Sequence, residues 1–464
     1  MTQSDQMAVR LPRGLAAAVL LAFYAAASPG QQGSVSRSDT DYKVDRPHPR
    51  LLMPQRRVRL LQRERERKSM RWDQFNLLIQ GRVQMPEPGF AYALYYVASG
   101  DESVGQKAVD WAAGPGADPR QIALVFDWCQ PLLGESTSAR LRAKLEKALG
   151  GVGRKASIPE VRNRLFASVA LAGHSDGSPE AAIRGIVEEW WNKDMAPALR
   201  EGASVIHQPD HMALFEIFHA LRDTFDIDPR ESAPKYFVTL PAYHILAHYP
   251  APFPAAENEY RIPLMKEHAD PDLREAARSR AAAFSMVAYD NNAEQMQFLQ
   301  GWLMLDRFLM RSPYGTPYEF MWANPYQPGL SYHYLPQVFH DPLNGRLLLR
   351  SSWEDDALWF CQSEGGVQVF RDGQVVNLER EAMNRPLVLG GTIVLPAALA
   401  EKFLANEEEP VRFFIVGLKP NARYDIEVDD EELREVETDR GGVLELNFPA
   451  RRNAYARLRE RKVP

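Results

Sequence analysis

The stretch from residue 207 to residue 221 reads His-Gln-Pro-Asp-His-Met-Ala-Leu-Phe-Glu-Ile-Phe-His-Ala-Leu and has the pattern of a helix with a polar start. Pro209 suits the first helical position, where its missing N–H costs no hydrogen bond, and Asp210 favours the positive end of the helix dipole. Behind them an apolar face recurs at helical spacing, formed by Leu214, Phe215, Phe218 and Leu221. We therefore expect a helix whose first turn holds the imidazole of His211 neutral and points it outward.

Two interpretations of the histidines in this stretch stay open. His207 and His211 can be ordinary hydrogen-bonded residues at a helix start, because short motifs often match by chance. They can also be functional groups, and motifs elsewhere in the chain bear on this second interpretation.

Length and composition restrict the protein class. The chain has 464 residues, of which 45% are hydrophobic and 25% charged, with a formal net charge of −6. This length allows two or three domains with a large core. A mildly acidic chain gives no reason to expect a nucleic-acid partner, which needs a basic face. The only cysteines, Cys129 and Cys361, lack a metal-binding spacing, and two unpaired buried thiols are favoured over a disulfide.

The N-terminus has the pattern of a secretory signal. A basic start at Arg10 and Arg13 precedes an apolar run from residue 14 to 27, which is too short to span a bilayer. We expect a signal peptide at residues 1–27, a disordered lead-in at residues 28–47, and a secreted or periplasmic protein. No later stretch is long and apolar enough for a membrane span in the mature chain.

The periodicity changes once along the chain. Helical patterns run from residue 49 to 310 in consecutive pairs, with Gly and Pro at the joins. Short β-type runs follow, including residues 346–350, 367–370, 392–395 and 411–416. We expect an α+β multidomain protein: an incomplete α/α toroid of helical hairpins at residues 48–312, an aromatic and Pro-rich bridge at 313–338, and an antiparallel β-sandwich at 339–464.

Several stretches resemble the heparinase II/III-like polysaccharide lyases. They are His48-Pro49-Arg50-Leu51-Leu52, residues 92–101, residues 123–133 around Asp127-Trp128, and Arg350-Ser351-Ser352-Trp353. Their order matches that family across roughly residues 48 to 448. The resemblance implies a secreted protein with an α/α toroid followed by a β-sandwich. It also implies β-elimination on an acidic, uronate-containing polysaccharide in the cleft between the two domains, and no cofactor.

The resemblance suggests a set of catalytic residues. The family commonly uses an Asn-His pair that opens a helix and a Tyr on a downstream loop. Asp210-His211 occupies the place of that pair, with His211 as base or carboxylate neutraliser. Tyr260 is the best candidate for the base and acid, and Arg261 for a charge clamp.

Other residues are candidates for substrate binding. Asp127 and Trp128 can line a cleft, where Trp stacks on sugar faces, or can pack and cap within the helical domain. Arg162 can grip a carboxylate or lie on a solvated helix face. His207 and His333 complete the predicted binding set.

Two departures from the family pattern leave other functions open. Asp210 replaces Asn, and its charge would repel a substrate carboxylate. No histidine lies beyond His340, which stands beside the bridge, so the rest of the sandwich offers neither a catalytic His nor a His-based metal site, and His333 and His340 are the only candidates nearby. The alternatives are a non-catalytic glycan-binding or surface protein, and an inverting glycoside hydrolase that uses two carboxylates such as Asp127 and Asp210.

Overall fold

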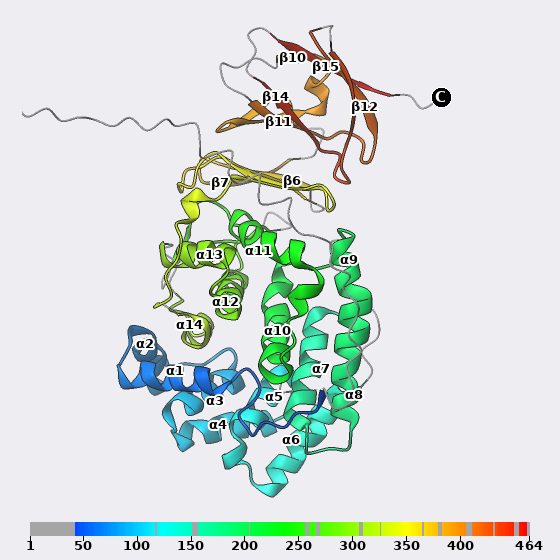
Figure 1. Ribbon diagram of the computed structural model, residues 1–464. Coiled ribbons are helices and arrows are strands. Elements are labelled where there is room, and N and C mark those ends of the chain that lie inside the picture. Colours follow the sequence, from blue (N-terminus) through cyan, green and yellow to red (C-terminus); the bar gives the residue numbers. More distant parts are fainter. Residues whose placement is uncertain are drawn as a thin grey trace, which may run out of the picture. The chain divides into compact units, whose positions relative to one another are not determined.

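A computed structural model of the chain shows a helical region followed by three larger β-sheets (Figure 1). It describes residues 42–116, 118–150, 156–203, 205–255, 259–265, 270–305, 310–324, 326–363, 366–378, 383–404, 411–429, 432–449 and 454–461. This order confirms the predicted fold class. Within these ranges, no helix combines the length and the apolar character that crossing a bilayer requires.

The predicted N-terminal segments are only partly covered by the described residues. The signal peptide at residues 1–27 lies outside them, as does the lead-in as far as residue 41. Residues 42–47 correct the prediction of disorder, because Tyr42 and Val44 are buried. The hydroxyl of Tyr42 donates to Glu188 at 3.1 Å, and its ring lies 6.5 Å from that of Phe225.

Six helices contact one another in series, and we call them the inner helices. They are α3 (Pro88–Ser99), α5 (Pro119–Trp128), α7 (Ile158–Leu171), α10 (His211–Phe225), α12 (Leu273–Tyr289) and α14 (Gly315–Trp322). The helix α14 also contacts α3 and α2 (Met70–Gln80), so the series returns to its start. The helix α1 (Gln55–Glu66) contacts α2 and α3.

Other helices connect the inner ones and reverse the chain between them. They are α4 (Glu102–Ala113), α6 (Glu135–Ala148), α8 (Ser178–Arg184) with a π-helix at Gly185–Met195 and α9 (Ala196–Arg200), α11 (Pro234–Leu246) and α13 (Glu294–Leu305). Because each connecting helix reverses the chain, the inner helices run parallel to one another. Their first turns therefore lie at one end, which we call the N-terminal face, and their last turns lie at the C-terminal end.

Local sequence signals fix where these helices begin. The carboxylate of Asp118 accepts the N–H of Gln121 at the start of α5, and Pro119 follows it. The carboxylate of Asp272 accepts the N–H of Arg274 at 2.9 Å and that of Glu275 at 3.2 Å at the start of α12. Such side chains satisfy backbone donors that have no partner within the helix.

The helix α10 confirms the apolar face predicted for the stretch 207–221. Leu214, Phe215, Phe218 and Leu221 are all buried, at most 1% exposed. Full burial of one such side chain contributes roughly 1.5–3 kcal/mol. A short 3₁₀-helix at Gln208–Asp210 precedes α10 and carries Pro209 in its first turn.

The predicted bridge at residues 313–338 is not one connecting segment. Its first part forms α14, which contacts α12, α2 and α3, because Tyr318, Phe320 and Trp322 are buried against the helical core. A 3₁₀-helix at Tyr332–Tyr334 follows, and the first strand of the β region begins at Val338.

The β region contains three sheets. Five strands form an antiparallel meander in chain order: β3 (Val338–Asp341), β4 (Arg346–Arg350), β5 (Trp359–Ser363), β6 (Gly366–Arg371) and β7 (Gln374–Leu378). A four-stranded sheet has the order β14 (Leu444–Phe448), β11 (Val411–Val416), β9 (Thr392–Pro396) and β8 (Leu387–Leu389). Another has the order β10 (Phe403–Leu404), β15 (Tyr455–Glu460), β12 (Arg423–Val428) and β13 (Glu432–Glu437). Among the described strands of these two sheets, pairing is antiparallel except that β11 and β9 run parallel.

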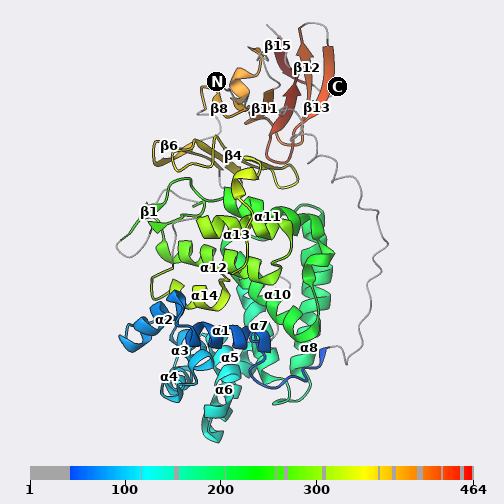
Figure 2. The ribbon, with the colours of Figure 1, turned by 60° about the vertical axis from the view of Figure 1, so that its left-hand side comes forward.

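The five-stranded sheet contacts the helical region through β3 and β4, which lie against α11 (Figure 2). Hydrogen bonds from β5 and β6 also join the two regions. The indole N–H of Trp359 donates to the carbonyl of Leu246 at 2.8 Å, and the hydroxyl of Tyr249 donates to Gln368 at 2.8 Å. A two-stranded ribbon of β1 (Phe253–Pro254) and β2 (Glu259–Tyr260) follows Tyr249.

The two cysteines confirm the expectation of unpaired thiols. Cys129 and Cys361 are both free and buried, and burial raises the pKa of each thiol to about 12. Neither is therefore a reactive thiolate near neutral pH.

Candidate functional site

A buried cluster of charges ties together the N-terminal halves of three inner helices. Arg120 on α5 donates from Nε to both carboxylate oxygens of Glu216 on α10, at 3.0 and 3.1 Å. Arg162 on α7 donates from Nη1 to the same carboxylate at 3.1 Å. Glu216 is fully buried, and such an enclosed carboxylate needs both cations to offset its lost hydration.

Two more inner helices join this cluster through Glu87, which precedes α3. The hydroxyl of Tyr318 on α14 donates to Glu87 at 2.6 Å, and Nη1 of Arg120 lies 3.5 Å from the same oxygen. Burial raises the pKa of Tyr318 well above its usual range. Tyr318 is therefore a fixed hydrogen-bond donor, and the cluster joins five of the six inner helices at one face.

The sixth inner helix, α12, brings a second carboxyl group beside Asp210. Burial raises the pKa of Glu275, and the negative charges of Asp272 and Asp210 add to this effect against the opposing charge of Arg278. The side chain of Glu275 is 27% exposed, and Asp210 is partly exposed. The side-chain amide of Gln208 donates to Ser279 on α12 at 3.3 Å, so the segment that carries Asp210 is fixed against α12.

A cation and a phenol lie next to this pair of carboxyl groups. Arg278 donates from Nη1 to Glu275 at 2.8 Å and from Nε to the hydroxyl of Tyr314 at 3.3 Å. The Arg278 side chain is 40% exposed, so a ligand can reach it. Asp210, Glu275, Arg278 and Tyr314 thus combine two carboxyl groups, a guanidinium and a phenol at the N-terminal face, and we call them the N-terminal cluster.

The structure corrects the expected orientation of His211. Its imidazole is fully buried, and neither ring nitrogen has a hydrogen-bond partner among the described residues. Its ring lies 5.7 Å from that of His244 and 6.5 Å from that of Tyr243 on α11. Burial lowers its pKa far below the usual value, so the imidazole is neutral as expected but faces the core. The side chains of α11 lie against it, and this contact cannot be predicted from the first turn of α10 alone.

Tyr260 and Arg261 lie at a different place from the N-terminal cluster. Tyr260 is 2% exposed in β2, where it pairs with Phe253 of β1. Arg261 donates to the carbonyl of Pro250 and, at 3.0 Å, to the carboxylate of Asp355. Arg261 therefore joins the β1–β2 segment to the β region, and its predicted role as a substrate clamp would require this ion pair to open.

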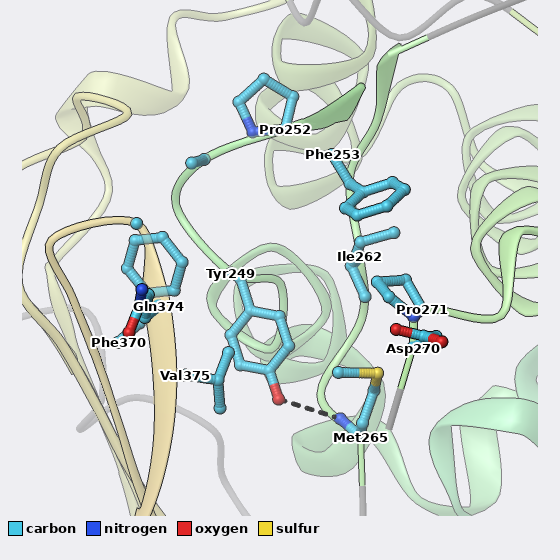
Figure 3. A pocket seen from close by; sticks show the side chains of 12 residues that line it. Tyr249, Pro252, Phe253, Ile262, Met265, Asp270, Pro271, Phe370, Gln374 and Val375 are labelled. Carbon is cyan, nitrogen blue, oxygen red and sulfur yellow. Dashed lines mark hydrogen bonds between the residues drawn. The ribbon is translucent and has the colours of Figure 1, made fainter. Parts of the chain in front are cut away.

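A pocket of about 460 Å³ lies beside these strands (Figure 3). It is lined mainly by apolar and aromatic side chains, among them Tyr249, Phe253, Ile262, Phe370 and Val375. Asp270 is the one charged residue among those that line it. The pocket therefore offers an aromatic surface and no cation, which does not match an acidic sugar.

Asp127 and Trp128 anchor the N-terminal segment of the helical region. Both oxygens of Asp127 are used: the backbone N–H groups of Arg50 and Leu51 donate to one at 2.9 and 2.8 Å, and Nδ1 of His48 donates to the other at 2.5 Å. The indole N–H of Trp128 donates to the carbonyl of Leu51 at 2.8 Å. Both residues are at most 2% exposed, so the packing interpretation holds and the predicted contact with substrate is corrected.

The remaining predicted binding residues are scattered. His207 is exposed, and its backbone N–H donates to Asp210 at 3.3 Å. Arg162 has a side chain only 15% exposed and is held by Glu216 and Asn163. His333 is exposed with its ring 4.5 Å from that of Tyr332. The structure thus brings His207 and Arg162 to the N-terminal face and leaves His333 next to the β region.

Glu275 and Arg278 were not among the residues predicted from the sequence, and Tyr314 was covered only by the aromatic bridge predicted at residues 313–338. One signal was available, because Asp272-Leu273-Arg274-Glu275 has the spacing of a helix start with two acidic residues. The first turns of alternate helices in a toroid share one face, so charged residues there were candidates as a group. In the part of the chain that the structure describes, no three His, Cys, Asp or Glu side chains are arranged to hold a metal ion.

Comparisons with known proteins give distant likenesses. No family model matches the chain, and no curated protein matches it. Similar solved structures include a heparan sulfate lyase HepC mutant from Pedobacter heparinus, at 12% identity and a TM-score of 0.34, which covers 81% of this chain and 76% of that one. A glycoside hydrolase has 10% identity and a TM-score of 0.28, with coverage of 81% and 71%. A GH127 β-arabinofuranosidase has 8% identity and a TM-score of 0.27, with coverage of 91% and 80%.

Proposed function

We propose that this protein is a secreted or periplasmic glycan-active enzyme whose substrate binds at the N-terminal face of the inner helices. The substrate class rests on the order of motifs that resembles the heparinase II/III-like family and on the toroid-plus-sheet architecture, which is an argument from analogy. The reaction class rests on one observation: the segment Gln208–Asp210 contacts α12, so that Asp210 and Glu275 place two partly exposed carboxyl groups at the same face. Burial raises the pKa of Glu275, in keeping with this arrangement.

A pair of carboxyl groups in different environments supports glycoside hydrolysis. In such enzymes one carboxylic acid protonates the leaving oxygen, while the other carboxylate activates water or attacks the sugar. Glu275 takes the role of the acid, because its raised pKa keeps the carboxyl protonated to higher pH. Asp210 takes the role of the base or nucleophile. The sequence suggested an inverting glycoside hydrolase that uses Asp127 and Asp210. We keep that reaction class but replace Asp127 by Glu275, because both oxygens of Asp127 accept hydrogen bonds in the core.

Arg278 supports a second candidate, β-elimination on a uronate. Its guanidinium is 40% exposed and contacts the hydroxyl of Tyr314, so it can bind a sugar carboxylate with a phenol close by. In this candidate Tyr314, whose hydroxyl accepts a hydrogen bond from Arg278, takes the proton-transfer role in place of Tyr260. The predicted roles of His211 and Tyr260 would require both side chains to leave the core.

The test is cleavage of a panel of neutral and acidic polysaccharides by the purified protein, followed by two readouts. Hydrolysis raises the concentration of reducing ends without ultraviolet absorbance of unsaturated uronates. Elimination raises both. We expect reducing ends without absorbance, and we expect Asp210→Asn and Glu275→Gln to abolish them.

The matched control is Glu135→Gln, which removes an exposed carboxylate from the first turn of α6. An absorbance increase would move the assignment to the lyase. No cleavage of any polymer, with retention of one of them on an affinity gel, would leave a non-catalytic glycan-binding protein.

A further inference from the structure

A second pocket lies at the opposite end of the inner helices from the N-terminal cluster. It has a volume of about 430 Å³ and is formed by α1, the last turns of α12 and α14, and the segments that follow them. Its lining includes Val287 and Ala288 of α12 and Met321 and Trp322 of α14. This size suits a small organic ligand.

Four arginines of α1 line this pocket: Arg56, Arg57, Arg59 and Arg63. Arg56, Arg59 and Arg63 are exposed and follow the spacing i, i+3 and i+7, which places them on one side of the helix. Arg59 donates to the side chain of Gln55 at 3.0 Å. Among the described residues no carboxylate pairs with these three guanidinium groups. They form a surplus of positive charge on one wall of a concave site.

The fourth arginine is part of the scaffold. Arg57 is 8% exposed, donates to the carbonyl of Leu52, lies 3.7 Å from the carboxylate of Asp223, and covers the ring of Trp322 at 4.3 Å. Burial lowers its pKa to about 10, and the nearby charges of Arg222 and Arg56 add to this effect while Asp223 opposes it. Asp223 therefore does not neutralise the exposed arginines, because it is already shared with Arg57 and Arg222.

One residue that lines the same pocket, Trp322, also carries an unused donor. The indole N–H of Trp322 is buried without a hydrogen-bond partner among the described residues, and its side chain is 2% exposed. A buried N–H without a partner is costly, and proteins normally satisfy it. The unpartnered donor and the exposed arginines both point to a ligand with acceptor oxygens, while Leu60, Val287 and Met321 provide apolar contacts.

We propose that this pocket binds a small organic ligand that carries a sulfate or phosphate ester. Guanidinium groups bind such oxyanions through paired, charge-assisted hydrogen bonds. The site is separate from the N-terminal cluster, because it lies at the other end of α12 and α14, and the proposal does not depend on the proposed function. At the C-terminal end of α14, the carbonyl of Ala323 already accepts a hydrogen bond from Arg71.

The test is isothermal titration calorimetry of the whole protein with three probes: N-acetylglucosamine 6-sulfate, N-acetylglucosamine 6-phosphate and N-acetylglucosamine. We expect one or both charged sugars to bind and the uncharged sugar not to bind. The stronger of the two charged sugars identifies the ester. The double variant Arg56→Glu/Arg59→Glu should weaken binding about tenfold or more, because charge-assisted hydrogen bonds from these two guanidinium groups would supply a large share of the affinity.

Two further variants test whether the loss of binding is specific to this pocket. Arg140→Glu/Lys147→Glu reverses two exposed charges on α6 and should leave binding unchanged. Trp322→Phe keeps an aromatic ring beneath Arg57 but removes the N–H, and should weaken binding while circular dichroism shows a folded protein. The proposal is overturned if neither charged sugar binds, or if the Arg56/Arg59 variant binds as tightly as the α6 control.

Discussion

The two ends of the inner helices differ in how their charged groups are used. At the N-terminal face, Glu275 and Arg278 keep 27% and 40% of their side chains exposed, and Asp210 is partly exposed beside them. At the C-terminal end, Asp127 is fully buried and holds two backbone N–H groups and His48. His219 near the end of α10 is likewise buried, with Nε2 bound to the carbonyl of Ser285 at 3.0 Å.

The difference separates residues that can meet a ligand from residues that hold the fold. A carboxylate whose two oxygens already accept hydrogen bonds within the protein has no oxygen free for a substrate. A carboxyl group that is half-buried beside another negative charge has a raised pKa and remains reachable, which is the combination that acid catalysis requires. Arg56, Arg59 and Arg63 differ from these buried groups at the C-terminal end, since they are exposed and have no carboxylate partner among the described residues.

The largest expected effect is on activity at the N-terminal face. Asp210→Asn and Glu275→Gln should each lower kcat/KM about 100-fold or more, because general acid–base catalysis contributes about 10²- to 10⁴-fold. Both changes preserve shape, so thermal unfolding monitored by circular dichroism should change little. A variant that loses activity only in proportion to its loss of folded protein would contradict the assignment.

A substitution of Glu216 tests whether the buried charge cluster at the same face stabilises the fold or takes part in catalysis. Glu216→Ala leaves Arg120 and Arg162 without their shared partner, and should lower the free energy of unfolding by about 3–5 kcal/mol. Urea denaturation measures this loss. If the variant instead keeps its stability and loses activity, Glu216 belongs to the catalytic site, and that site extends into the buried charge cluster.

Asp127 gives the matching test at the C-terminal end. Asp127→Ala leaves the N–H groups of Arg50 and Leu51 unsatisfied in the core, and should cost about 2–4 kcal/mol of stability. Per folded molecule, kcat should stay unchanged. The control Asp110→Ala removes an exposed carboxylate from α4 and should have little effect on urea denaturation. Loss of kcat with normal stability would restore the substrate-binding role first predicted for Asp127.

The smallest expected effect is a shift in pH dependence. Arg278 lowers the pKa of Glu275 and so opposes the larger effect of burial. Arg278→Met should therefore raise that pKa further. If protonated Glu275 is the acid, activity is lost as the pH rises through its pKa, so the alkaline limb of the pH–rate profile should move to higher pH. A move to lower pH would contradict the role of Glu275 as the acid.

Secondary structure was largely readable from the sequence because its signals are local. The pattern Leu214, Phe215, Phe218 and Leu221 predicted the buried face of α10, and Pro209 and Asp210 marked its start. The change from helical to strand periodicity gave the fold class. The helix α14 was missed within an aromatic-rich stretch, because its buried Tyr318, Phe320 and Trp322 serve packing against other inner helices.

The site was harder to predict because its members come from separate helices. Asp210 was identified, but its partners Glu275, Arg278 and Tyr314 lie 65 or more positions further along the chain. Conversely, the motifs around His48 and Asp127 stood out in the sequence and proved to bind each other in the core. A distinctive motif can thus mark an anchor of the fold rather than a catalytic residue.

The sequence by itself determined the helix starts, the apolar faces and the order of a helical region before a β region, since these depend on neighbours within a few residues. Only the tertiary structure decided which titratable groups reach solvent. His211 opens its helix in a position where an imidazole can point outward, yet α11 covers it and burial keeps it neutral. Glu275 opens its helix in the same way and stays partly exposed. The cost of burying a charge depends on the segments packed around it, and those segments are distant in sequence.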